Sequence, residues 1–296
     1  MDTNFIHGVI PPILTPVDES DHVVDSAMRR LTEHVIEGGV HGILAFGSNG
    51  EFYGVDPMEQ QRALTIILDQ VSGRVPVYMG IGAITTRECI KTAIMAEKEG
   101  AQAVSILAPM FVAPNDDELY EHFTAIAKSV SLPVLLYNNP GRVGYNFSTN
   151  LVARLAKLPN IVGMKDSSGN LTMTAEYIRL TKGEQYKVLA GKDTVILASL
   201  VYGAVGCVAS TANVVPKLVV EIYDKFMAGD IKGALEAQYK LNPFRMVFDK
   251  ASFPIAAKEA ANLIGLDLGN PIKPNKGCSD DVKAQLKKTL QDIGVL

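Results

Sequence analysis

The chain of 296 residues has no tryptophan, five histidines and three cysteines. Cys89, Cys207 and Cys278 stand far apart and form no CxxC pair, so we predict reduced thiols rather than a disulfide framework or a zinc site. The histidines, at positions 7, 22, 34, 41 and 122, are scattered along the chain in the same way. The sequence therefore offers no cluster of metal ligands, and we expect no bound metal.

Long hydrophobic runs and an excess of positive charge are also missing. No apolar run approaches the roughly 18 residues that span a bilayer, and the first residues lack the basic and apolar regions of a signal peptide. The 28 Lys and Arg against 32 Asp and Glu give a formal net charge of -4, without a basic cluster that would mark a nucleic-acid surface. We expect a cytoplasmic protein with no membrane or polynucleotide partner.

The residues that are present predict an α/β fold. Hydrophobic residues make up 47% of the chain and charged residues 20%, which suits a large buried core. Short runs rich in Val, Ile and Leu alternate with segments that have helical apolar spacing, as in βα units around a parallel sheet. The eight predicted strands span residues 8–14, 42–46, 75–81, 103–108, 133–138, 161–165, 186–190 and 204–208. A closed (β/α)8 TIM barrel explains this count better than an open doubly wound sheet, which periodicity alone does not exclude.

Between the predicted strands lie helical segments with clear start signals. Asp56 precedes Pro57 as a capping residue, and Ser148 and Asn170 are placed to cap two later helices. The predicted helices cover residues 26–37, 57–71, 86–99, 116–130, 148–157 and 171–181. After about residue 224 the alternation stops, and residues 231–248, 253–264 and 280–293 read as helices. We therefore predict a catalytic barrel over 1–224 and a small helical domain over 225–296.

Four of the predicted strands end in polar sequences, and barrel enzymes place their catalytic groups at these carboxyl ends. The sequences are GSNGE at 47–51, YNNPGR at 137–142, MKDSSGN at 164–170 and GKD at 191–193. We expect them to converge on one pocket. A dinucleotide-binding oxidoreductase is a weaker interpretation, because residues 80–83 lack the third glycine of a GxGxxG turn.

Lys165 is the strongest candidate for a catalytic residue because it ends an apolar strand. Strict alternation would place Ile161, Gly163 and Lys165 on one face of that strand. If this face is the barrel interior, desolvation favours the neutral amine that can attack a ketone. The alternative is a lysine that reaches solvent from the end of a strand.

Tyr137 ends the preceding strand and is placed to transfer protons, or only to pack as a half-buried strand residue. Ser48 and Asn49 can present hydroxyl, amide and backbone N–H groups to a carboxylate, although their glycine neighbours also suit a simple tight turn. Arg142 can bind a second carboxylate through its planar fork, or lie free on the surface.

Together these residues resemble the dihydrodipicolinate synthase and N-acetylneuraminate lyase family of class I, pyruvate-dependent aldolases, over essentially the whole chain. The shared patterns are a GxxGE loop at 47–51, YNxP at 137–140 and IxGxK at 161–165, followed by a small polar stretch. The resemblance implies that Lys165 forms an imine with pyruvate, that Tyr137 transfers protons and that Ser48 and Asn49 bind the pyruvate carboxylate. The predicted substrate-binding residues are Ser48, Asn49, Gly50, Arg142, Gly191 and Val208. It also implies a homotetramer that needs no cofactor beyond its own lysine.

The second substrate is less well defined, because family members share the pyruvyl imine and differ in the aldehyde. Ser48 and Asn49 stand where the synthases usually have two threonines, and Phe111 stands where they have a tyrosine that relays protons. Arg142 matches the arginine that holds the carboxylate of aspartate semialdehyde in the synthases. We therefore expect a lyase resembling the synthases that joins pyruvate to an anionic aldehyde or releases it from the adduct. The alternatives are an aldolase for 4-hydroxy-2-oxoglutarate, a 2-oxo-3-deoxy sugar acid or N-acetylneuraminate, and a non-catalytic protein that binds 2-oxo acids.

Overall fold

The computed structural model describes residues 1–296 and contains one sheet of eight parallel strands. The strands are β1 Gly8–Val9, β2 Ile43–Ala45, β3 Val77–Ile81, β4 Ala103–Leu107, β5 Val134–Asn138, β6 Ile161–Asp166, β7 Lys187–Ala190 and β8 Gly206–Cys207. From β2 to β8 each strand pairs with the next one in the chain, and β8 pairs with β1. The sheet closes because the Ile13 amide donates to the Leu44 carbonyl at 3.0 Å and the Leu44 amide donates to the Pro11 carbonyl at 2.9 Å. The predicted (β/α)8 barrel is confirmed.

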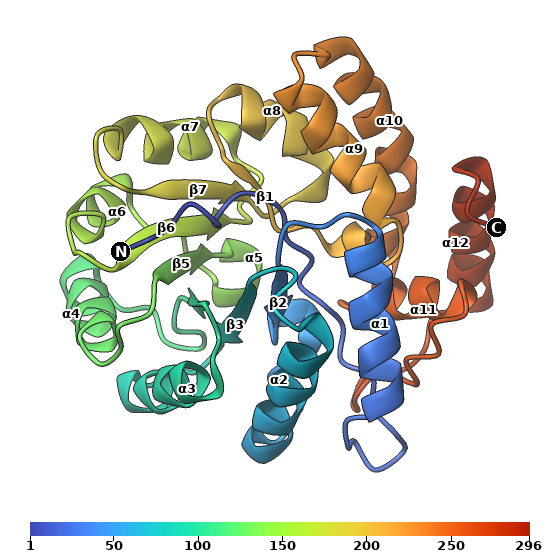
Figure 1. The fold of residues 1–296 in the computed structure, drawn as a ribbon, viewed down its shortest axis with the longest axis horizontal. Coiled ribbons are helices and arrows are strands. Elements are labelled where there is room, and N and C mark those ends of the chain that lie inside the picture. Colours follow the sequence, from blue (N-terminus) through green and yellow to red (C-terminus); the bar gives the residue numbers. More distant parts are fainter.

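Helices surround the barrel, and three more extend the chain beyond it (Figure 1). Around the strands run α1 Asp25–Glu37, α2 Pro57–Val71, α3 Thr86–Glu99, α4 Asp116–Ala127, α5 Pro140–Val143, α6 Thr149–Leu155, α7 Leu171–Leu180, α8 Ile196–Val201 and α9 Pro216–Met227. The last three are α10 Ile231–Val247, α11 Ile255–Leu263 and α12 Asp280–Asp292. None of the helices combines the length and the hydrophobicity that a membrane-spanning helix requires.

The predicted helix starts agree with the structure. Asp56 accepts a hydrogen bond from the Met58 amide at 2.8 Å, and the side chains of Ser148 and Asn170 cap α6 and α7 in the same way. The predicted segments did not include α5, α8 and α9, although Pro216 occupies the first turn of α9, where proline is favoured. The predicted boundary at residue 224 falls inside α9, and the division into two domains stays a prediction.

A group of nine buried apolar side chains fills the inside of the barrel. They come from every strand or the residue next to it: Ile6, Ile10, Leu44, Tyr78, Ala103, Leu135, Val162, Leu189 and Val208. Because side chains occupy the lumen, a ligand can enter only at the ends of the strands.

A β-bulge in β6 changes which residues face this interior. Val134 pairs with Ile161 but Leu135 pairs with Gly163, so Val162 is an extra residue in the ladder. Val162 joins the interior group, whereas Ile161 packs in the larger cluster that includes the helices. The prediction that Ile161 shares a face with Gly163 was therefore wrong, because strict alternation does not continue through a bulge. Beyond the bulge, Lys165 pairs with Tyr137 and Leu189 and faces the interior.

Candidate active site

A cavity of about 530 Å³ opens at the carboxyl ends of the strands. Its walls come from the turn after β2, from the ends of β5 to β8, and from the stretch between the end of α10 and the start of α11. Six of the predicted site residues line it: Asn49, Tyr137, Arg142, Lys165, Gly191 and Val208. The strand ends thus converge on one polar pocket, as the sequence analysis expected.

Lys165 lies at the base of this cavity with only 3% of its surface exposed. Its Nζ is 4.1 Å from the centroid of the Tyr137 ring, and it forms none of the ion pairs in the structure. The next residue, Asp166, is held by hydrogen bonds from the side chains of Asn138 and Thr174, at 2.9 and 2.6 Å. A buried lysine at the cavity base without a carboxylate partner is placed to act as an amine nucleophile.

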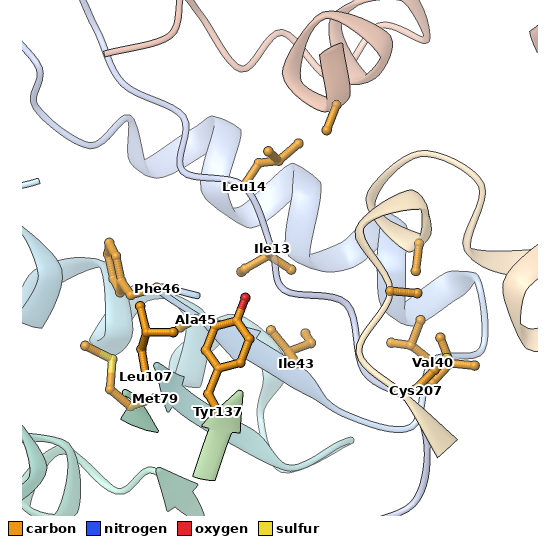
Figure 2. Packing of buried hydrophobic residues seen from close by; sticks show 14 of the residues in the cluster. Ile13, Leu14, Val40, Ile43, Ala45, Phe46, Met79, Leu107, Tyr137 and Cys207 are labelled. Atoms are coloured by element: carbon orange, nitrogen blue, oxygen red, sulfur yellow. The ribbon is translucent and has the colours of Figure 1, made fainter. Parts of the chain in front are cut away.

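Tyr137 rises from the end of β5 among Ile13, Ala45 and Leu107 (Figure 2). Its hydroxyl oxygen accepts a hydrogen bond from Asn139 Nδ2 at 2.8 Å and lies 3.3 Å from Ser48 Oγ. Burial acts to raise the pKa of Tyr137, but the Lys165 charge and these hydrogen bonds outweigh burial and lower the pKa below its ordinary value. The phenol is therefore placed and tuned for proton transfer beside the amine.

The GSN turn forms the 3₁₀ helix η1 Ser48–Gly50, which presents Asn49 to the cavity. Asn49 Oδ1 accepts a hydrogen bond from Ser210 Oγ at 2.8 Å, which leaves its amide nitrogen available to an anion. Ser48 instead contacts the Tyr137 hydroxyl, and the carbonyl of Gly50 accepts from Thr15 Oγ1 at 2.7 Å. Of the predicted turn residues, only Asn49 lines the cavity, whereas Ser48 and Gly50 lie behind it.

A buried ion pair holds this turn against the C-terminal helices. Glu51 follows η1 with a φ of 51° and accepts from Lys258 Nζ at 3.0 Å, with the two side chains 0% and 1% exposed. The other oxygen of Glu51 accepts from the Ile272 amide at 3.0 Å. Burial lowers the pKa of Lys258, and the Glu51 charge opposes this shift. No sequence pattern marks Lys258, because its contact with Glu51 joins residues 207 positions apart.

The ends of β7 and β8 complete the cavity wall. The carbonyl of Gly191 accepts a hydrogen bond from Ser167 Oγ at 3.1 Å, and a Cβ at this position would lie 2.1 Å from that oxygen. Only glycine permits this close approach. Asp193 Oδ2 accepts from both the amide and the hydroxyl of Thr211 at 2.7 Å, so its charge is already satisfied. Val208 provides an apolar contact at the base.

Arg142 lies at the exposed rim of the cavity, on α5. Its guanidinium carbon is 4.3 Å from the centroid of the Phe253 ring, and it forms no ion pair. Phe111 is 95% exposed with a φ of 70° and does not line the cavity. The unpaired cation at the rim is thus free to bind an acid group.

Several lining residues carry no recognisable pattern in the sequence. Ser210 begins a 3₁₀ turn after β8, Arg245 lies on α10 and Phe253 lies in the segment before α11, and only the tertiary structure brings them to the cavity. No group of three or more His, Cys, Asp and Glu side chains is arranged to hold a metal ion.

A closed (β/α)8 barrel with a buried lysine and tyrosine facing a polar cavity at its carboxyl end has the architecture of a barrel enzyme. The family model described as "Dihydrodipicolinate synthetase family" matches residues 5–293. A 4-hydroxy-tetrahydrodipicolinate synthase from Methanopyrus kandleri is 35% identical over 98% of this chain and 97% of the relative.

Two solved structures of pyruvate complexes superpose closely. A chloride-inhibited dihydrodipicolinate synthase from Acinetobacter baumannii has a TM-score of 0.95 and 32% identity, covering 98% of this chain and 100% of the other. YagE, a prophage protein of the dihydrodipicolinic acid synthase family from E. coli K12, has a TM-score of 0.94 and 28% identity, covering 98% and 99%. The chain belongs to the dihydrodipicolinate synthetase family and is a lyase.

Proposed function

We propose that this lyase forms a Schiff base between Lys165 and pyruvate and joins the bound pyruvyl group to an anionic aldehyde, or releases it from the adduct. The observation that supports this most directly is the position of Lys165. Its amine is buried at the base of the cavity, 4.1 Å from the Tyr137 ring centroid and without an acidic partner. The two similar structures with pyruvate support pyruvate as the first substrate.

The first half of the proposed reaction needs one nucleophile and one proton carrier. The neutral amine of Lys165 attacks the ketone carbon of pyruvate and gives a carbinolamine, and a proton from Tyr137 allows its hydroxyl to leave as water. Asn49 is placed to bind the carboxylate of the pyruvyl group. The resulting iminium makes the methyl protons acidic, and the Tyr137 phenolate takes one of them to give an enamine. The enamine attacks the aldehyde carbon, the new alkoxide takes a proton from Tyr137, and water hydrolyses the product iminium to free Lys165. No cofactor is required, because the lysine itself supplies the electron sink.

The test of the imine is chemical trapping. Borohydride added with pyruvate should inactivate the enzyme irreversibly, because it reduces an iminium to a stable secondary amine. Mass spectrometry of the digested protein should find the reduced pyruvyl group on Lys165. Labelling of a different lysine, or no labelling at all, would contradict the proposed mechanism.

The charge of the cavity favours an acidic second substrate. Arg142 is an unpaired cation at the rim, where the part of a substrate remote from Lys165 would lie. Either condensation with an acidic aldehyde, as in 4-hydroxy-tetrahydrodipicolinate synthesis, or cleavage of an acid such as 4-hydroxy-2-oxoglutarate fits this arrangement. A panel of these substrates and the sugar acids, followed by pyruvate consumption or release, separates the alternatives. A protein that only binds 2-oxo acids would turn over none of them.

Replacing Arg142 with alanine should weaken the use of the acidic substrate and leave imine formation intact. We expect kcat/KM for the acidic substrate to fall by roughly 10- to 100-fold, the value of a hydrogen bond to a charged group. Arg142→Lys keeps the charge without the fork and should lose less. Steady-state kinetics with an acidic and a neutral aldehyde check this. Equal losses for both would assign Arg142 a structural role.

A further inference from the structure

Arg245 is a second arginine in the cavity, and most of its hydrogen-bonding capacity is unused. It lies near the end of α10, and its side chain is only 12% exposed. Nη1 donates to Asp249 Oδ1 at 2.9 Å, while the buried Nε has no acceptor. A guanidinium carries five N–H donors, and buried donors in proteins nearly always find partners. Arg245 therefore lines the cavity with fewer acceptors than its donors require.

The balance of charge in the cavity also favours an anionic ligand. Its cationic lining residues are Arg142, Lys165, Lys192 and Arg245, and its acidic ones are Asp193 and Asp249. The carboxylate of Asp193 is already satisfied by Thr211, and Asp249 is 51% exposed, so solvent screens its charge. The cavity thus retains an excess of positive charge, which a neutral substrate would leave without a counterion.

We propose that Arg245 binds the carboxylate of the second substrate together with Arg142. This inference rests on the proposed Schiff-base function and adds a specificity-determining residue to it. The substrate class is then an aldehyde with its own carboxylate, whose adduct with pyruvate carries two acid groups. One acid group lies at Asn49, and the other lies between the two arginines.

The position of Arg245 suits this role better than a purely structural one. Its i, i+4 pair with Asp249 is partly exposed, and such pairs stabilise a helix only weakly. The guanidinium carbon is 5.6 Å from the centroid of Phe248, which restricts the side chain. Arg142 is exposed at the rim, whereas Arg245 is nearly buried. The two guanidinium groups, one exposed and one nearly buried, can then bind the same carboxylate.

The test compares succinic semialdehyde with butyraldehyde, which have the same chain length and differ in the carboxylate. At saturating pyruvate the unmodified enzyme should prefer the acidic aldehyde. Arg245→Leu should lower kcat/KM for succinic semialdehyde by roughly 10- to 100-fold and change that for butyraldehyde by less than about threefold. Arg179→Leu is the matched control, because it removes the exposed arginine that pairs with Glu176 on α7. It should change neither value.

Two further variants separate recognition from structure. Arg245→Lys keeps the charge and should recover part of the loss, and it stands in for Arg245→Leu if that variant does not fold. Asp249→Asn removes the partner of Arg245, so the same loss in this variant would assign Arg245 to the helix turn and overturn the proposal. Combining Arg142→Ala with Arg245→Leu should cost less than the product of the single losses, because both residues hold one carboxylate. Independent, multiplicative losses would also overturn it.

Borohydride trapping distinguishes a failure of this inference from a failure of the proposed function. If pyruvate labels Lys165 in both the unmodified enzyme and Arg245→Leu, any change in aldehyde preference reports on the second subsite alone. Retained trapping without a preference for succinic semialdehyde would overturn the role of Arg245 and leave the Schiff base intact. Absence of trapping in the unmodified enzyme would overturn the proposed function itself.

Discussion

Lys165→Arg should abolish pyruvate labelling and lower turnover by roughly 10⁴- to 10⁶-fold, the range seen when a catalytic nucleophile is removed. Arginine keeps a positive charge in the cavity, but its guanidinium stays protonated and cannot attack a ketone. The loss should therefore appear in kcat and in labelling together. Stopped assays and mass spectrometry after borohydride treatment measure both.

The matched control is Lys187→Arg. Lys187 lies on β7 in register with Gly163, and its Nζ donates to the carbonyl of Thr3 near the N-terminus of the chain. This variant should keep labelling and turnover, because the substitution is the same and only the position differs. Full activity in Lys165→Arg would show that another amine forms the imine.

Tyr137→Phe should lower turnover by roughly 10²- to 10⁴-fold, as expected for the loss of a general acid-base group. The ring and its contact with Lys165 remain, so the fold should persist. Imine formation should slow because the hydroxyl that carries the proton is missing. Tyr78→Phe is the control, because this buried tyrosine donates to the Phe5 carbonyl at 3.2 Å and does not line the cavity. It should lower the melting temperature at most and leave kcat unchanged. An unchanged rate in Tyr137→Phe would make Tyr137 a packing residue.

The pH profile gives an independent check on Tyr137. Proton donation requires the protonated phenol, so activity should fall as the pH rises through its pKa. Because the pKa of Tyr137 lies below the usual value of 10.0, this alkaline limb should begin below that pH in the free enzyme. In kcat/KM profiles of Tyr137→Phe the limb should disappear.

The strand count and the caps could be predicted because they depend on local patterns. Apolar runs of five to seven residues and the Asp56–Pro57 pair specify structure within one element. The bulge at Val162 could not be predicted, because it depends on the pairing of β5 with β6. The short strands β1 and β8 also end earlier than their apolar runs, since Pro11 and Pro12 provide no amide for a ladder.

The residues of the site show the same difference between local sequence patterns and tertiary contacts. Lys165, Tyr137 and Arg142 stand in polar sequences at strand ends, where position alone marks them as candidates. Arg245 and Phe253 come from segments that carry no such pattern, and they reach the cavity only through the packing of α10 and α11. Lys165, Tyr137 and Arg142 are thus visible in the sequence, whereas Arg245, which we propose binds the second substrate beside Arg142, is not.

The buried ion pair between Glu51 and Lys258 limits which chimeras this chain can form with related sequences. Its two members lie on opposite sides of the predicted boundary at residue 224, with almost no exposure to solvent. Leaving one charge buried without the other costs about 3–5 kcal/mol, a large share of the stability of a typical domain. A crossover at this boundary is therefore tolerated only when the incoming segment brings its own cation to the position of Lys258. The C-terminal helices and the turn that presents Asn49 must be inherited together.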